Sequence, residues 1–118
     1  MYKIEVFSNF SAAHRLRNYK GKCENIHGHN WKVGVTVSVD KLDKIGIAVD
    51  FRDVKRQLKE ILKKLDHKNL NSLAYFRRAN PTSENLARFI YEQLKKRSPI
   101  SAVSVWEAED SNATYYEG

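Results

Sequence analysis

Apolar and polar residues alternate in four stretches of this chain, and this period of two is typical of half-buried strands. The stretches are residues 2–16, 31–39, 100–109 and 113–117. The first two lie close together in sequence and the last two are separated only by Asp110-Ser111-Asn112, which predicts a turn. The pattern therefore predicts one pair of strands at each end of the chain.

Two stretches between these pairs carry apolar residues at helical spacing. The first covers residues 51–65, with Asp50 as its expected N-cap, and its stripe consists of Val54, Leu58, Ile61, Leu62 and Leu65. The second opens at residues 80–84, with Thr82 or Ser83 as the cap, and ends at Ser98-Pro99. Its stripe consists of Leu86, Phe89, Ile90 and Leu94.

The expected order is strand, strand, helix, helix, strand, strand, an α+β fold with a four-stranded antiparallel sheet and both helices on one face. A chain of 118 residues is long enough for one domain with its own core but too short for two domains that each bury a sufficient core. We therefore expect a single domain over residues 1–118.

Three of the four histidines and the only cysteine lie in the first quarter of the chain, at His14, Cys23, His27 and His29. Side chains two apart on a strand share a face, so His27 and His29 should project together. His14, at the end of the preceding strand, can face them across an antiparallel pair. Three imidazoles with an open fourth position are the catalytic arrangement for zinc, whereas four protein ligands make a structural site. The rival hypothesis is a structural zinc site with Cys23 as fourth ligand, which predicts that Cys23→Ala loses the metal.

Two further places carry titratable groups in unusual settings. Glu107 falls on the same strand face as Val103 and Val105, so it is either an edge residue or an anchor for a ligand that carries N–H groups. Asp66 and His67 follow the first helix directly, but neighbouring residues rarely point the same way, so the sequence does not predict a hydrogen bond between them.

Composition indicates the cellular location of the protein and the class of partner that it binds. A single cysteine excludes an intramolecular disulfide, and no apolar run is long enough to span a membrane, so we expect a cytoplasmic protein without a membrane partner. The 21 Lys and Arg against 14 Asp and Glu give a net charge of +7. These cations are dispersed along the chain and no nucleic-acid-binding motif accompanies them, which favours a phosphorylated small molecule over nucleic acid.

Six segments together resemble the 6-pyruvoyl-tetrahydropterin and 6-carboxy-tetrahydropterin synthase family, in the right order and across the whole chain. They are residues 10–16, 23–29, 49–51, 65–70, 81–85 and 106–107. The resemblance implies the tunnelling fold (T-fold). Its subunits join their sheets into a barrel and assemble as a homohexamer, a dimer of trimers, with active sites at subunit interfaces.

The resemblance also assigns roles to individual residues. It implies that His14, His27 and His29 bind Zn²⁺, that Cys23 is a catalytic thiol, and that Asp66 and His67 complete the catalytic triad from a neighbouring subunit. It further implies that Glu107 accepts hydrogen bonds from the pterin ring, with Thr82 and Ser83 as further ring partners.

The implied substrate is 7,8-dihydroneopterin triphosphate. Three residues separate Cys23 from His27, as in the 6-carboxy branch, whose reaction releases triphosphate and acetaldehyde on the route to 7-deazaguanines such as queuosine and archaeosine. The pyruvoyl branch usually has five, and some relatives use a glutamate near Glu24 to make a 6-hydroxymethyl pterin. We expect the 6-carboxy activity, with these two as alternatives and a non-catalytic zinc-binding module as the rival of another class.

Overall fold

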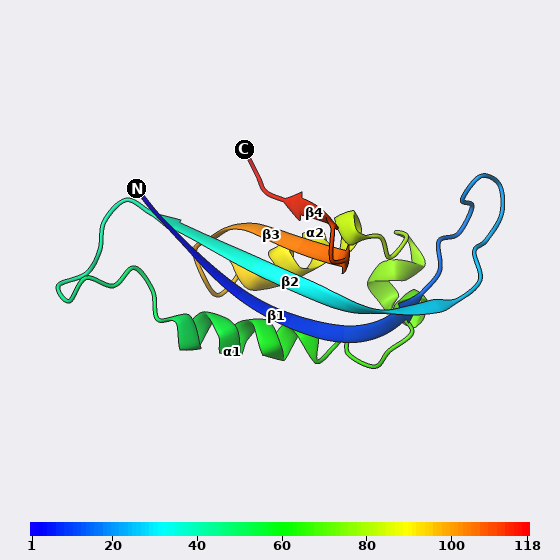
Figure 1. Ribbon diagram of the computed structural model, residues 1–118, viewed down its shortest axis with the longest axis horizontal. Coiled ribbons are helices and arrows are strands. Elements are labelled where there is room, and N and C mark those ends of the chain that lie inside the picture. Colours follow the sequence, from blue (N-terminus) through cyan, green and yellow to red (C-terminus); the bar gives the residue numbers. More distant parts are fainter.

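Two thirteen-residue strands, β1 (Tyr2–His14) and β2 (His27–Val39), form the long curved ribbon of the protein (Figure 1). The computed structural model describes residues 1–118. The two strands pair antiparallel without a break, from Tyr2 opposite Val39 to His14 opposite His27. β3 (Ile100–Ala108) and β4 (Ser111–Tyr115) extend the sheet in the order β1-β2-β3-β4, which confirms the expected four-stranded antiparallel sheet.

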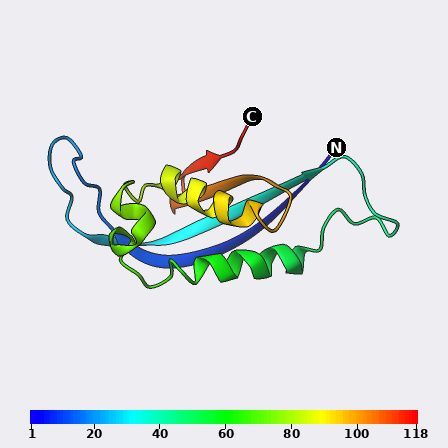
Figure 2. The ribbon, with the colours of Figure 1, turned by 180° about the vertical axis from the view of Figure 1, so that it is seen from behind.

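Two helices, α1 (Phe51–Leu62) and α2 (Ser83–Lys95), cover one face of this sheet, as Figure 2 shows from behind. Both begin where the sequence predicts, because the side chains of Asp50 and Thr82 accept hydrogen bonds from the first-turn N–H groups of Arg52 and Asn85. The core lies between helices and sheet. Its largest fully buried side chains are Trp31, Phe76, Leu58, Leu65, Leu70, Leu86, Ile90 and Leu94.

Several element bounds differ from the sequence prediction, and two elements were not predicted. α1 ends at Leu62 instead of Leu65, because the chain tightens there into bonds between residues three apart, although Leu65 stays fully buried. β4 begins at Ser111, opposite Ala108, so the turn is Glu109-Asp110 and not residues 110–112. Two short 3₁₀ helices, η1 (Leu70–Ser72) and η2 (Ala74–Arg77), were not predicted and connect α1 to α2.

No helix in the structure is both long enough and apolar enough to span a membrane.

Leu58 on α1 has no exposed surface and belongs to the core shared with the sheet. Leu58→Ala should lower the free energy of unfolding by about 2–5 kcal/mol, because the truncated side chain leaves a cavity. Lys55→Ala, on the exposed side of the same helix, should change it by less than about 0.5 kcal/mol. Urea unfolding of both variants tests this, and equal losses would contradict the assigned core face of α1.

Candidate metal centre and active site

The three histidines meet on the helix-covered face of the sheet, at the end where β1 stops and β2 starts. His14 and His27 are direct partners across the two strands, and His29 lies two residues along β2. The ring centroids are 4.7 Å apart for His14 and His27, 4.8 Å for His27 and His29, and 5.2 Å for His14 and His29. The predicted convergence of the three rings is therefore present.

Two of the rings are fixed in one tautomer by backbone carbonyls. Nδ1 of His14 lies 2.7 Å from the carbonyl oxygen of Pro81, and Nδ1 of His27 lies 2.9 Å from that of Asn25. A carbonyl can only accept, so each Nδ1 carries the proton and each Nε2 keeps a free lone pair. Both rings are thus prepared to bind a cation through Nε2.

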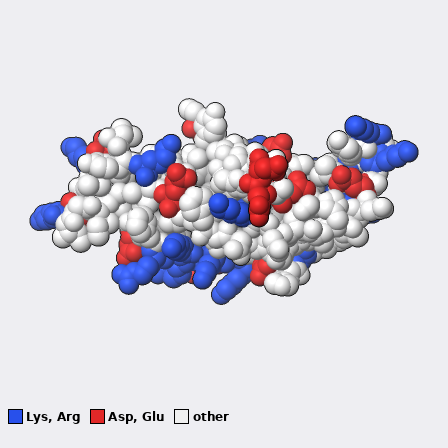
Figure 3. All heavy atoms as spheres, viewed as in Figure 1, with Lys and Arg blue, Asp and Glu red and all other residues white.

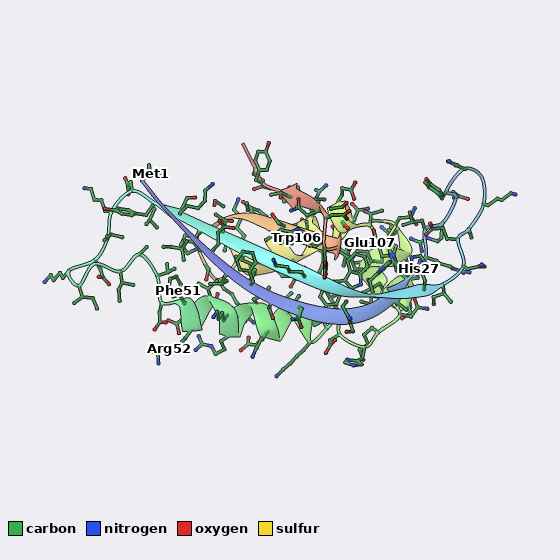
Figure 4. All side chains as sticks on the ribbon, in the orientation of Figure 1. Met1, His27, Phe51, Arg52, Trp106 and Glu107 are labelled. Carbon is green, nitrogen blue, oxygen red and sulfur yellow. The ribbon has the colours of Figure 1, made fainter.

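Glu107 on β3 is the fourth member of this cluster, on the sheet face that the sequence predicts. One donor atom from each of the four side chains lies within 4.8 Å of the others. Oε1 of Glu107 is 2.8 Å from Nε2 of His29 and 3.3 Å from Nε2 of His14. Figure 4 shows Glu107 and His27 at the end of the sheet far from Met1.

Although the carboxylate is close, it does not meet hydrogen-bond geometry, and the buried Nε2 atoms of His14 and His29 have no hydrogen-bond partner. Buried polar atoms are rarely left without one unless a ligand satisfies them. Three converging imidazoles suit a zinc-like cation in number and in kind and leave a fourth position open. These residues therefore fit a divalent metal.

The surroundings of His29 favour its neutral form. Burial lowers the pKa of His29, and the adjacent rings of His14 and His27 act in the same direction, whereas Glu107 opposes them. Trp31 is fully buried and packs against two of the histidines, with its ring centroid 4.9 Å from that of His14 and 5.3 Å from that of His29. Neutral imidazoles are the form that coordinates metal.

Cys23 is exposed in the loop between β1 and β2 and is not part of the metal cluster. The structure thus gives the structural-site hypothesis no cysteine ligand. The neighbouring Glu24 is engaged elsewhere: its side chain accepts from the N–H of Leu16 at 3.1 Å, and its own N–H donates to the Leu16 carbonyl at 3.0 Å. These two hydrogen bonds hold Glu24, the residue after Cys23, against Leu16 at the start of the loop.

Asp66 and His67 do point toward each other, contrary to the expectation for adjacent residues. Oδ2 of Asp66 is 3.0 Å from Nδ1 of His67. The cause is a backbone conformation in the left-handed region, since His67 has φ 57°. The N–H of Ser11 donates to Asp66 Oδ1 at 2.9 Å and lowers the pKa of Asp66, with a further contribution from His67.

This pair does not join the histidine cluster within one chain. His67 is 82% exposed and lines an open groove of about 550 Å³ along the edge of β1. Ser11, Ala13, Gly28 and Asn30 line the same groove from positions that alternate with those of the clustered histidines, but His29 of the cluster lines it as well. Asp66 and His67 lie outside the group whose donor atoms converge within 4.8 Å.

The predicted ring partners Thr82 and Ser83 begin α2 beside the cluster, directly after Pro81. The hydroxyl oxygen of Thr82 accepts from the N–H of Asn85 at 3.1 Å. Its proton remains able to donate to a ligand. The roles of the Pro81 and Asn25 carbonyls could not be predicted, because a backbone acceptor can come from any residue type.

Basic side chains gather along α1, more densely than the sequence suggested (Figure 3). Arg52, Lys55, Arg56, Lys59 and Lys63 line a groove of about 400 Å³ beside Phe7 and Ser8 of β1. Ser8 lies six residues before His14 on β1, which corresponds to about 20 Å along an extended strand. This basic groove is therefore separate from the histidine cluster.

Comparison with known proteins identifies the family. The family model described as 6-pyruvoyl tetrahydropterin synthase matches residues 3–118. The chain belongs to this family. Its members of known structure share the T-fold, and the structure of 6-pyruvoyl tetrahydropterin synthase from Caenorhabditis elegans superposes with a TM-score of 0.88 at 30% identity, covering 99% of this chain and 96% of that one.

Relatives of this chain carry different names. The chain is 33% identical to the 6-carboxy-5,6,7,8-tetrahydropterin synthase of Haemophilus influenzae, over 99% of this chain and 100% of the relative. It is 39% identical to human 6-pyruvoyl tetrahydrobiopterin synthase, over 93% of this chain and 87% of the relative. The chain is thus an enzyme of the tetrahydropterin synthase family, similar to both branches.

The cluster predicts which side chains hold the metal. His27→Ala should lose the bound zinc, because it removes one of three converging imidazoles, whereas Cys23→Ala should retain it, because the thiol lies outside the cluster. Metal content after gel filtration, measured by atomic emission, distinguishes the two variants. Loss of zinc from Cys23→Ala would instead support the structural site.

Proposed function

We propose that this protein is a zinc-dependent 6-carboxy-5,6,7,8-tetrahydropterin synthase that acts on 7,8-dihydroneopterin triphosphate and releases triphosphate and acetaldehyde. Its product would serve the synthesis of 7-deazaguanines such as queuosine. The observation that carries the proposal is the cluster of three imidazoles, with two unpartnered buried Nε2 atoms, at the root of a loop that bears the only cysteine. An anionic substrate also suits a chain with a net charge of +7.

In this proposal His14, His27 and His29 hold the zinc ion through Nε2. The bound ion supplies Lewis acidity to the oxygens of the substrate side chain and favours the thiolate form of a nearby cysteine. Cys23 then accepts a proton from the substrate, and its exposure on the loop leaves the sulfur accessible. His67, oriented by Asp66, relays protons with it.

Glu107 anchors the pterin ring by accepting hydrogen bonds from its N–H groups. Its side chain is 41% exposed, so its carboxylate is accessible to a ligand. Thr82 and Ser83 contribute hydroxyl contacts to the same ring from the first turn of α2. A carboxylate beside hydroxyl groups recognises the row of N–H donors along the edge of a pterin.

A second copy of the chain supplies Asp66 and His67 to each site, within a homohexamer. Two observations support this. Within one chain Asp66 and His67 contribute no donor atom to the cluster. The sheet also has two edge strands, β1 and β4, of which β1 is covered by the 66–69 segment only near its end. Joining edges into a closed barrel would remove the exposed strand edges.

Two other products are open to the same site, 6-pyruvoyl-tetrahydropterin and a 6-hydroxymethyl pterin. The short spacing from Cys23 to His27 favours the 6-carboxy product. The hydrogen bonds of Glu24 to Leu16 argue against Glu24 as the base of a hydroxymethyl-forming enzyme, because its carboxylate already serves the loop. The candidate of another class is a non-catalytic zinc-binding module.

Incubating the zinc-loaded protein with 7,8-dihydroneopterin triphosphate should give 6-carboxy-tetrahydropterin and acetaldehyde in equal amounts, identified by mass spectrometry. Zinc-loaded Cys23→Ala should be slower by about 10²–10⁴-fold, the range for loss of a positioned acid–base group. A pyruvoyl product without acetaldehyde would assign the other branch. Absence of any product would favour the binding module.

The shared site predicts complementation between two inactive variants. If Cys23 and His67 of one site come from different chains, co-expressed Cys23→Ala and His67→Ala subunits should regain about a quarter of wild-type activity through random assembly. Cys23→Ala co-expressed with the Cys23→Ala, His67→Ala double variant is the control and should stay inactive. Failure of the first mixture would place both groups in one chain.

A further inference from the structure

The orientation of His14 depends on a residue far from it in sequence. Its ring is 2% exposed, and its Nδ1 lies 2.7 Å from the carbonyl of Pro81, sixty-seven residues away. The Pro81 carbonyl can orient the His14 ring only if the carbonyl is itself held in place. The hydrogen bonds on either side of Pro81 therefore affect the orientation of this histidine.

Asn80, next to Pro81, is bridged to the backbone of Arg17 in the loop after β1. Its Oδ1 accepts from the Arg17 N–H at 2.9 Å and from Arg17 Nε at 3.2 Å, and its Nδ2 donates to the Arg17 carbonyl at 2.9 Å. The Arg17 guanidinium also donates to the carbonyls of Phe76 and Ala79. The segment before Pro81 is thus tied to the loop that leaves His14.

The other side of Pro81 is held by the start of α2. The Asn80 carbonyl accepts from the N–H of Thr82 at 2.8 Å and from Nδ2 of Asn85 at 2.9 Å. Pro81 itself is buried and has a restricted φ. Its carbonyl therefore has little freedom to turn away from His14.

We propose that Asn80 and Arg17 are positioning residues for the metal centre. They hold the Pro81 carbonyl where it keeps the proton of His14 on Nδ1, so that Nε2 faces the other imidazoles. This inference rests on the proposed metal site and extends it by naming what prepares one ligand. Removing a residue that orients a metal ligand without contacting the metal typically weakens metal binding by about 10–100-fold.

The chain offers a matched control in Asn71. Its side chain bridges the backbone of Arg15 in the same way, with Oδ1 accepting from the Arg15 N–H at 2.8 Å and Nδ2 donating to the Arg15 carbonyl at 2.9 Å. Arg15 is even closer to His14 in sequence than Arg17 is. Asn71 does not adjoin Pro81, however, so its removal loosens the same loop without freeing that carbonyl.

Zinc affinity of the full-length protein, measured by competition with a chromophoric chelator, tests the inference. Asn80→Ala should weaken binding by about 10–100-fold, and Asn71→Ala should leave it near the wild-type value. Arg17→Lys keeps the charge and the backbone hydrogen bonds to Asn80 but loses the guanidinium bonds to the carbonyls of Phe76 and Ala79. Its zinc affinity should lie between those of the two asparagine variants. Equal losses in Asn80→Ala and Asn71→Ala would overturn the inference, because the effect would then be general loosening of the loop.

A metal-free readout separates this inference from the proposed function. In ¹⁵N spectra of the imidazoles, wild-type and Asn71→Ala apoprotein should show His14 protonated at Nδ1, and Asn80→Ala should show a mixture of tautomers. An unchanged His14 signal in Asn80→Ala would refute the positioning role. If the wild type bound no zinc while Asn80→Ala still changed the tautomer, the proposed enzyme function would fail and the positioning of His14 would stand.

Discussion

The pairing of β1 with β2 decides where each imidazole of the cluster points. Thirteen consecutive pairs place His14 opposite His27, and a slip of one residue would turn His27 and His29 to the other face of the sheet. Two features beside the cluster hold this register. Phe10 and Trp31 stack with centroids 5.9 Å apart, and Nε1 of Trp31 donates to the carbonyl of Ala12 at 3.2 Å. The metal centre is thus a consequence of core packing.

The same alternation divides the chemistry between two sides of the sheet. The three clustered histidines lie among the residues whose side chains point toward the helices, whereas most of the strand residues that line the groove beside His67 lie at the intervening positions. Ser11 links the two sides, because its side chain faces the groove while its backbone holds Asp66 and His67 at the edge of β1. A strand that carries the clustered histidines on one side in this way fixes a carboxylate–imidazole pair at its edge.

Features that depend on short-range periodicity could be predicted from the sequence, and features that depend on backbone geometry could not. The strand faces of His27, His29 and Glu107 follow from a period of two. The contact between Asp66 and His67 could not be predicted, because it needs a positive φ at a residue that is not glycine. Likewise, η1 and η2 lack a periodic apolar stripe, being three and four residues long.

Side chains that form hydrogen bonds with residues far away in the sequence also could not be identified from the sequence. Nothing local in the sequence distinguishes Asn80 from Asn71, yet only the former adjoins the carbonyl that orients His14. The resemblance to a family supplied the roles of Cys23, Thr82 and Ser83, which periodicity could not.

Trp31 gives the protein a built-in optical probe of its own centre. Its indole is fully buried and stands edge-on to two of the three imidazoles. Indole emission responds to protonated imidazoles and to paramagnetic ions at such short range. Occupancy of the cluster by a paramagnetic ion in place of zinc can therefore be followed by intrinsic fluorescence, with the half-exposed Trp106 as the second emitter to be subtracted.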